Sequence, residues 1–185
     1  MSDLRLTAAG IRRLLGLLEE ELAAAGVLGE VHVVGGAVFC LALGARDATR
    51  DVDALFRPAA EVRRAAARAA ARAGVPEDWL NDAVKGFLGR RGDFEPYLEL
   101  PHLRVYTAHP RYLLAMKCAA MRLGPEFHDL DDVRYLLRHL DVRTAGGAME
   151  IVRRYFPEEA IPAKTRYALE EILGGWGYGT EAVQP

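Results

Sequence analysis

The sequence predicts a mixed α/β protein of the α+β class: a small mixed β-sheet flanked by helices, followed by a helical C-terminal part. Three observations predict this class. Short strand-like segments occur early in the chain, amphipathic or alanine-rich helical patterns surround them, and the last third carries helical patterns only. The length of 185 residues suits one compact domain with a small appendage. We expect a sheet-bearing core at 1–108, a helical part at 109–174 and a flexible, glycine-rich tail at 175–185.

The sheet is predicted from the first half of the chain. Apolar residues at helical spacing indicate a helix over 7–25, and the β-branched segment 30–34 reads as a buried strand that Gly35 and Gly36 end. A short helix at 37–43 and a polar loop at 45–50 lead into a second strand at 51–56. The later predicted elements are a helix at 59–73, a helical stretch at 76–88, strands at 97–100 and 103–106, and helices at 110–122, 127–140, 144–155 and 162–173.

Composition excludes several classes of protein. The 24 Lys and Arg residues against 26 Asp and Glu residues give a net charge of −2, which excludes nucleic-acid binding through bulk positive charge alone. No apolar run approaches the roughly 20 residues of a membrane-spanning helix, so we expect no membrane association. The first residues lack the pattern of a secretory signal, and Cys40 and Cys118 lie in apolar segments without a CxxC motif. We therefore expect two buried thiols and a cytoplasmic protein.

Gly35 and Gly36 stand between a predicted strand and a predicted helix. Glycine allows a backbone to approach a phosphate closely, and the N–H groups at a helix N-terminus point at such an anion. The alternative is purely steric, because strand–Gly–Gly–helix turns are common.

Asp51 and Asp53 interrupt an otherwise apolar strand. Residues two apart project from the same face, so the two carboxylates lie side by side and repel each other unless a cation joins them. Mg²⁺ takes carboxylate oxygens and keeps room for substrate phosphates. The alternative is an edge strand whose acidic face lies in water.

Lys117, Asp129 and Asp132 fall on inward-facing stripes of two predicted helices. Lys117 is in register with Leu113, and the two aspartates are in register with Leu136 and Leu140. These positions predict a polar pocket between helices and sheet. The alternative is a buried Lys117–Asp132 ion pair.

Together these motifs resemble those of a known superfamily. The segment 33–36, the loop containing Arg46 and Thr49, and Asp51-Val52-Asp53 resemble the hG[G/S]…DhD signature of the DNA polymerase β-like nucleotidyltransferases. The segments 113–120 and 129–133 resemble the late motif of AbiEii-like minimal nucleotidyltransferases, which include the MenT-type toxins of toxin–antitoxin pairs. The resemblance covers residues 30 to 140, and Trp79-Leu80-Asn81 also resembles a segment of small members of that group.

The resemblance implies a role for each matching residue. It implies that Asp51 and Asp53 bind the catalytic metal, Mg²⁺ or Mn²⁺, and that Lys117 contacts phosphate and Asp132 completes the catalytic set. The nucleotide-binding residues that it implies are Gly35, Gly36, Arg46, Thr49, Lys117 and Asp129. Residues 109–174 would complete this active site. Two departures stand out: Gly36 replaces the Ser of many members, and no third strand carboxylate is evident beyond the candidates Glu95 and Glu99.

The function that follows is a metal-dependent transfer of a nucleoside monophosphate from an NTP such as ATP to an acceptor hydroxyl. Family resemblance makes RNA, at the 3′ end of tRNA, the expected acceptor and implies a toxin with a cognate antitoxin. The alternatives are a non-catalytic nucleotide- or partner-binding module of the same fold, and a small-molecule nucleotidyltransferase.

Two further features leave alternatives open. Arg64, Arg68 and Arg72 form a ridge at i, i+4 and i+8, which either tracks an RNA backbone or is a solvated helix face. Asn81 either reaches the pocket or caps a local turn. The sequence does not decide between these interpretations.

Overall fold

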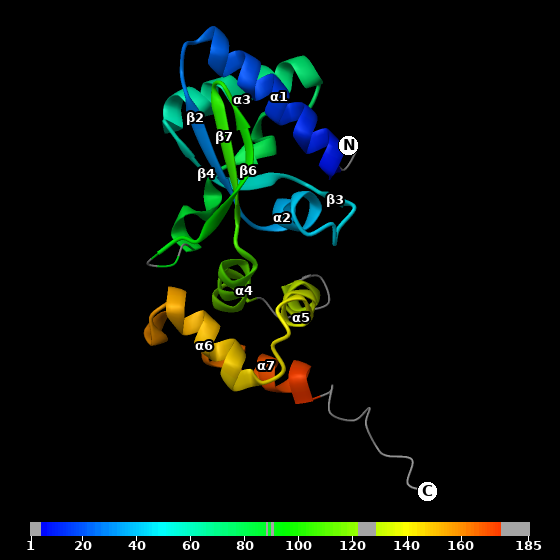
Figure 1. Ribbon diagram of the computed structural model, residues 1–185, viewed down its shortest axis with the longest axis vertical. Helices are drawn as coiled ribbons and strands as arrows, with labels where there is room; N and C mark the ends of the chain where they lie inside the picture. The colour runs from blue at the N-terminus through cyan, green and yellow to red at the C-terminus, as the bar shows by residue number, and fades with distance from the viewer. Residues whose placement is uncertain (1–4, 88, 90, 122–128, 175–185) are drawn as a thin grey trace, which may run out of the picture. The chain divides into compact units, whose positions relative to one another are not determined.

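The computed structural model describes residues 5–87, 89, 91–121 and 129–174, and its chain divides into two compact units (Figure 1). Residues 5–86 and 93–109 form the sheet unit. The described residues of 87–92 and 110–174 form the helical unit. The mixed class predicted from the sequence, a small mixed sheet with helices and a helical C-terminal part, is confirmed.

The sheet unit is organised around a five-stranded mixed sheet of order β5-β4-β2-β7-β6. Strand β2 (Gly29–Val33) lies at its centre, antiparallel to β4 (Val52–Arg57) and parallel to β7 (Leu103–Ala108). Strand β6 (Phe94–Leu100) is antiparallel to β7, and β5 (Leu80–Asn81) is parallel to β4. The predicted strands are confirmed, and the hairpin strands are longer than expected.

Two helices, α1 (Ala8–Ala24) and α3 (Ala59–Ala73), pack side by side on the sheet unit (Figure 1). Thr7 caps α1 by accepting the Gly10 N–H, and Gly74 ends α3 in the left-handed conformation. Along β4, buried residues alternate with half-buried ones. This alternation is typical of a sheet with one face against helices, and it places Asp53 on the other face.

The polar loop before β4 is more ordered than the sequence predicts. Its residues form β3 (Ala48–Thr49), which pairs antiparallel with β1 (Leu6–Thr7) in a separate two-stranded sheet. Helix α2 (Gly36–Leu41) precedes this loop and is confirmed. Because two-residue strands carry no periodic pattern, the sequence analysis missed both β1 and β3.

The predicted helix at 76–88 is wrong. The chain instead forms a 3-10 turn, η1 (Glu77–Trp79), then β5, then a second 3-10 turn, η2 (Ala83–Phe87), and Leu88 lies outside the described residues. The physical reason is a tertiary contact: the fully buried Trp79 donates its indole N–H to the Ala66 carbonyl at 3.1 Å. This contact directs the following residues into the sheet rather than into a helix.

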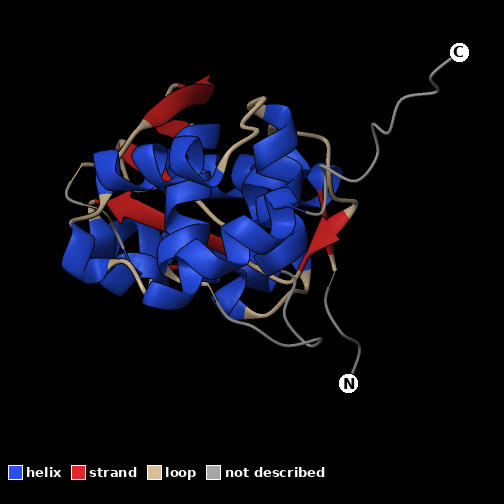
Figure 2. Ribbon diagram, turned by 90° about the horizontal axis from the view of Figure 1, so that it is seen from below, coloured by secondary structure: helices blue, strands red, loops and turns tan. Residues whose placement is uncertain are grey.

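The helical unit contains α4 (Pro110–Ala119), α5 (Asp129–His139), α6 (Ala145–Tyr155), η3 (Glu158–Ala160) and α7 (Ala163–Gly174). The four predicted helices are confirmed within the described residues, and helix is the predominant regular structure in Figure 2. Buried Thr165 donates its hydroxyl to the Cys118 carbonyl at 2.9 Å, which joins α7 to α4.

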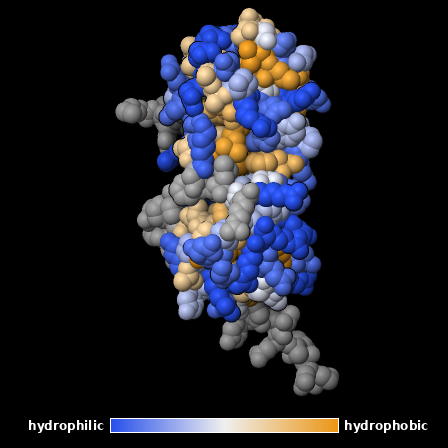
Figure 3. All heavy atoms as spheres, turned by 90° about the vertical axis from the view of Figure 1, so that its left-hand side faces the viewer, coloured by the Kyte–Doolittle hydropathy of each residue, from blue (hydrophilic) through white to orange (hydrophobic). Residues whose placement is uncertain are grey.

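The face drawn in Figure 3 is mainly hydrophilic over the described residues, with smaller hydrophobic patches. Among the described residues no helix is both long enough and apolar enough to cross a membrane. Cys40 and Cys118 are buried free thiols, as expected, and burial raises the pKa of Cys118 to about 12. The predicted tail at 175–185 lies outside the described residues.

Candidate functional site

The turn between β2 and α2 lies directly against Asp53. Gly35 has φ +64° and ψ −146°, a backbone conformation available in practice only to glycine. A Cβ atom added to Gly35 would lie 3.0 Å from Asp53 Oδ2. The first glycine is therefore required both by the shape of the turn and by the carboxylate beside it.

The second glycine lies against the loop that follows α2. A Cβ atom at Gly36 would lie 2.7 Å from Thr49 Oγ1 and 2.8 Å from Arg46 Nη1. The Arg46 guanidinium also lies over the Phe39 ring, 5.2 Å from its centroid. Thr49 and Arg46 thus occupy the space that a serine side chain at position 36 would need, which accounts for glycine at this position.

Asn81 links to both aspartates, to Asp51 through its side chain and to Asp53 through backbone pairing. Asn81 is the register partner of Asp53 in the parallel β4–β5 pair, and its Nδ2 donates to Asp51 Oδ2 at 3.1 Å. Both aspartates are half-buried. The alternative of an edge strand is wrong for this motif, because β4 lies between β5 and β2.

The protonation equilibrium of Asp51 reflects this environment. Burial raises the pKa of Asp51, and the nearby Asp78 carboxylate adds to the increase. The hydrogen bond from Asn81 and the charge of Arg50 act in the opposite direction but do not cancel the increase. Asp51 is therefore a carboxylate whose negative charge is incompletely compensated by its surroundings.

The chemistry of these donors fits a hard divalent cation. Mg²⁺ is commonly held by one or two carboxylates, while water and substrate phosphates complete its octahedral shell. Asp51, directly before β4, contacts Asn81, and Asp53 on β4 lies beside the glycine turn, so the segment supplies two carboxylates. Within the part of the chain that the structure describes, no group of three or more His, Cys, Asp or Glu side chains is arranged to hold a metal. A metal at this position would therefore depend on ligands from a bound substrate.

The two candidates for a third strand carboxylate lie elsewhere in the sheet. Glu95 and Glu99 are on β6, and strands β7 and β2 separate β6 from β4. Three strand spacings amount to about 14 Å. Glu99 pairs with Arg104 at 3.3 Å, and Glu95 lies 3.6 Å from His109. Neither glutamate joins Asp51 and Asp53.

Lys117, Asp129 and Asp132 form a separate cluster within the helical unit. Lys117 Nζ lies 3.2 Å from Asp129 Oδ1 and 2.8 Å from Asp132 Oδ2. The exposed fractions of the three side chains are 18%, 8% and 6%. The predicted alternative of a buried Lys117–Asp132 pair is what the structure contains, and it is extended by Asp129. The predicted site residues therefore form two groups, one in each unit.

Two of the three arginines of the α3 ridge pair with acids of α1, and the third, Arg64, lies 3.5 Å from Glu61 of α3 itself. Arg68 lies 2.7 Å from Glu21, and Arg72 lies 2.9 Å from Glu21 and 2.5 Å from Glu20. Hydrogen bonds from both arginines lower the pKa of Glu21. This pairing supports the interpretation of a solvated helix face rather than a track for an RNA backbone.

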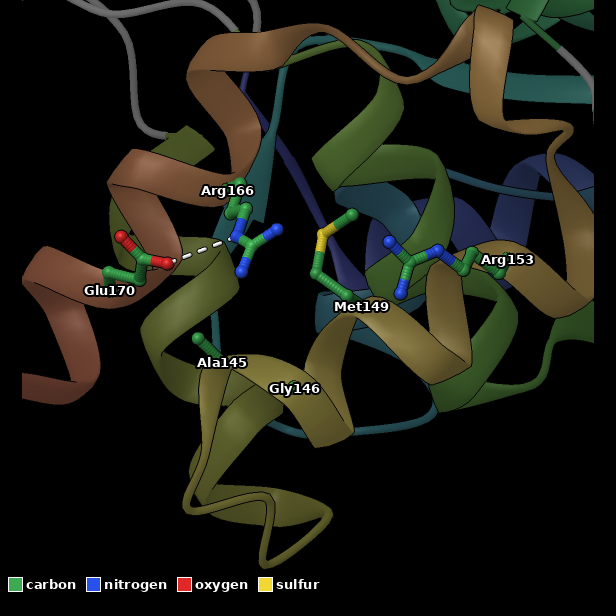
Figure 4. Close-up of a pocket in the computed structure, with 6 residues that line it drawn as sticks. All are labelled: Ala145, Gly146, Met149, Arg153, Arg166 and Glu170. Carbon is green, nitrogen blue, oxygen red and sulfur yellow. Dashed lines mark hydrogen bonds and ion pairs between the residues drawn. The ribbon is translucent and has the colours of Figure 1, made fainter.

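A small pocket of about 80 Å³ lies between α6 and α7 (Figure 4). In that view Arg153 and Arg166 lie on either side of Met149, and Arg166 pairs with Glu170 at 3.1 Å. Arg153 pairs with Glu158 at 2.6 Å. Both arginines are thus already matched by carboxylates, and none of the predicted site residues lines this pocket.

Comparisons with known protein families, with curated proteins and with solved structures found no match. The sequence left open whether Asn81 reaches the pocket or caps a local turn. In the structure it does both: its Nδ2 donates to Asp51, and its Oδ1 accepts the Ala83 N–H at 3.2 Å. The available signals were the resemblance of Trp79-Leu80-Asn81 to a family segment and the position of the asparagine directly after an apolar pair.

Proposed function

We propose that the sheet unit carries a nucleotidyltransferase site, which moves a nucleoside monophosphate from an NTP to an acceptor hydroxyl and releases pyrophosphate. The observation that supports it is the contact between the glycine turn and the acidic strand. The Cβ position of Gly35 lies 3.0 Å from Asp53 Oδ2, so the glycine turn lies directly against the Asp53 carboxylate, as a shared phosphate and metal site would require.

Different residues of the sheet unit would bind the triphosphate and the metal. Backbone N–H groups of Gly35 and Gly36 would face the triphosphate, and Arg46 and Thr49 beside Gly36 would add a guanidinium and a hydroxyl. Asp51 and Asp53 would hold Mg²⁺ or Mn²⁺, which when bound neutralises phosphate charge during an in-line displacement. Because α2 has only six residues, individual amides rather than a helix dipole would provide the binding.

A role for Lys117 as a phosphate contact is implied by the resemblance alone. Within the helical unit, Asp129 and Asp132 orient its ammonium group, since both lie within 3.2 Å of Nζ. RNA as the acceptor, and the toxin and antitoxin assignments, rest on the resemblance alone, because the α3 ridge lends them no support.

The decisive experiment uses each of the four α-labelled NTPs with Mg²⁺ and three acceptor pools: total RNA, a protein extract and a panel of small alcohols. Label on RNA supports the proposed acceptor, and label on a small alcohol indicates a small-molecule enzyme. Binding of NTP without transfer of label to any pool would overturn the catalytic proposal in favour of a binding module. Asp53→Asn serves as the inactive control.

A further inference from the structure

Asn81 makes two hydrogen bonds that together fix its orientation. Its Oδ1 accepts the backbone N–H of Ala83 at 3.2 Å, and its Nδ2 donates to Asp51 Oδ2 at 3.1 Å. A backbone N–H can only donate, so the side of the amide that faces Ala83 must be the carbonyl oxygen. The NH₂ group is therefore directed at Asp51 by the backbone of Asn81's own turn.

The segment that carries Asn81 is anchored on both sides. Its strand β5 pairs with β4, where Asn81 is the register partner of Asp53. Two residues earlier, the fully buried Trp79 donates its indole N–H to the Ala66 carbonyl of α3. An amide held by a paired strand and a buried indole has little freedom to leave its partner.

A neutral donor suits a carboxylate that must remain available to a ligand. An arginine or lysine at this place would compete with a cation for Asp51, whereas an amide donates one hydrogen bond without cancelling the charge. A carboxylate has about four lone-pair sites, so it can accept from Asn81 and still coordinate a cation. Groups that orient a metal ligand in this way typically change metal affinity or activity by 10- to 100-fold when they are removed.

We propose that Asn81 is a positioning residue, which holds the Asp51 carboxylate in the orientation that binds the divalent cation. This inference rests on the function proposed above. The competing interpretation is that Asn81 only caps the η2 turn through Ala83.

Two substitutions separate these roles. Asn81→Thr keeps a hydroxyl that can accept from the Ala83 N–H, but it is too short to donate to Asp51. Asn81→Gln keeps an NH₂ donor on a longer side chain. If Asn81 only caps the turn, the threonine variant behaves like the wild type. If it positions Asp51, the threonine variant binds the metal more weakly than the wild type, and the glutamine variant has an affinity between the two.

The test measures Mn²⁺ affinity directly, by electron paramagnetic resonance in the presence of a non-hydrolysable NTP analogue. We expect Asn81→Thr to weaken Mn²⁺ binding by about 10-fold. In transfer assays the Mg²⁺ concentration for half-maximal rate should rise by a similar factor, while kcat at saturating Mg²⁺ and KM for the NTP stay near the wild-type values. Thermal unfolding of both variants monitors the fold.

The chain contains a single asparagine, which gives a second readout. With side-chain ¹⁵N-labelled asparagine, one pair of Nδ2 proton resonances reports on Asn81 alone. We expect Mg²⁺ with the NTP analogue to shift this pair in the wild type and not in Asp51→Ala.

The outcomes distinguish the two proposals. A wild type that neither binds Mn²⁺ with the analogue nor transfers label overturns the proposed function. A wild type that does both, together with an Asn81→Thr variant of unchanged Mn²⁺ affinity and unchanged Mg²⁺ dependence, overturns the positioning role only.

Discussion

The acidic site residues of the two units have different partners. In the helical unit, Asp129 and Asp132 are more than 90% buried, and both contact the ammonium group of Lys117. In the sheet unit, Asp51 is half-buried and accepts a hydrogen bond from a neutral amide. The first arrangement places an ammonium group in contact with both carboxylates, whereas the second places a neutral amide in contact with Asp51.

This difference distinguishes acids that already contact a cation of the chain from acids that remain able to bind a cation from solution. Buried carboxylates need a cation, because removing a charged group from water costs several kcal/mol for each ion. In the helical unit the cation is a lysine of the chain. In the sheet unit, burial raises the pKa of Asp51 despite the Asn81 hydrogen bond. A bound cation would therefore stabilise the charged form of this carboxylate.

The largest expected effect is on activity, at the sheet unit. Asp53→Asn should reduce transfer about 10³-fold, equivalent to ~4 kcal/mol of barrier, because it removes one of two cation-binding carboxylates. The melting temperature should stay within a few degrees of wild type or rise. The matched control is Asp131→Asn on α5, since Asp131 is 74% exposed. Transfer that survives in the Asp53 variant would contradict the site.

The next effect is on stability, at the helical unit. Lys117→Met leaves Asp129 and Asp132 buried without their ammonium partner and should lower the free energy of unfolding by about 3–5 kcal/mol. Urea denaturation measures this. The variant with Lys117→Met, Asp129→Asn and Asp132→Asn together should recover most of the loss, because all three charges are removed. If that variant is stable but inactive, the cluster serves the reaction as well as the fold.

A smaller effect is expected at the glycine turn. Gly35→Ala should cost about 1–3 kcal/mol of stability from its positive φ and should also displace Asp53, which lowers transfer. Gly26→Ala is the control, since Gly26 also has φ +64° but no atom lies within 4 Å of its Cβ position. Chemical denaturation and labelling assays compare the two. If the two variants are equally active, the glycine turn does not belong to the active site.

The smallest effect is expected on the α3 ridge. Replacement of Arg68 and Arg72 by glutamine should leave RNA labelling and its salt dependence unchanged, because Glu20 and Glu21 already neutralise these arginines. A salt series of filter-binding measurements with tRNA provides the check. A reduced salt slope would restore the ridge as a contact for the RNA backbone.

The elements predicted most accurately from the sequence are those whose burial follows a simple period. Helix α3 runs from Ala59 to Ala73 as predicted, because an alanine-rich face and a glycine at position 74 define it locally. The segment at 76–88 was predicted wrongly because its conformation depends on the contact of Trp79 with α3, which no local pattern encodes.

The candidate site likewise contains features that local sequence determines and features that depend on tertiary contacts. The proximity of the glycines to Asp53 follows from chain order, since a strand, a tight turn and an antiparallel neighbour bring these residues together. The link between Asn81 and Asp51 spans 30 residues and depends on the register of a two-residue strand. Lys117 and its two aspartates were placed on the correct helix faces, but periodicity cannot tell whether a buried lysine contacts a ligand or an acid.

The small β1–β3 sheet makes the start of the chain part of the site's support. Thr49, whose hydroxyl lies against the second glycine, has Leu6 as its backbone partner, and Thr7 caps α1. Proteolytic trimming beyond residue 6 would therefore loosen the loop that carries Arg46 and Thr49 while leaving the five-stranded sheet intact. An affinity tag fused at that end would need a spacer long enough to leave this pairing undisturbed.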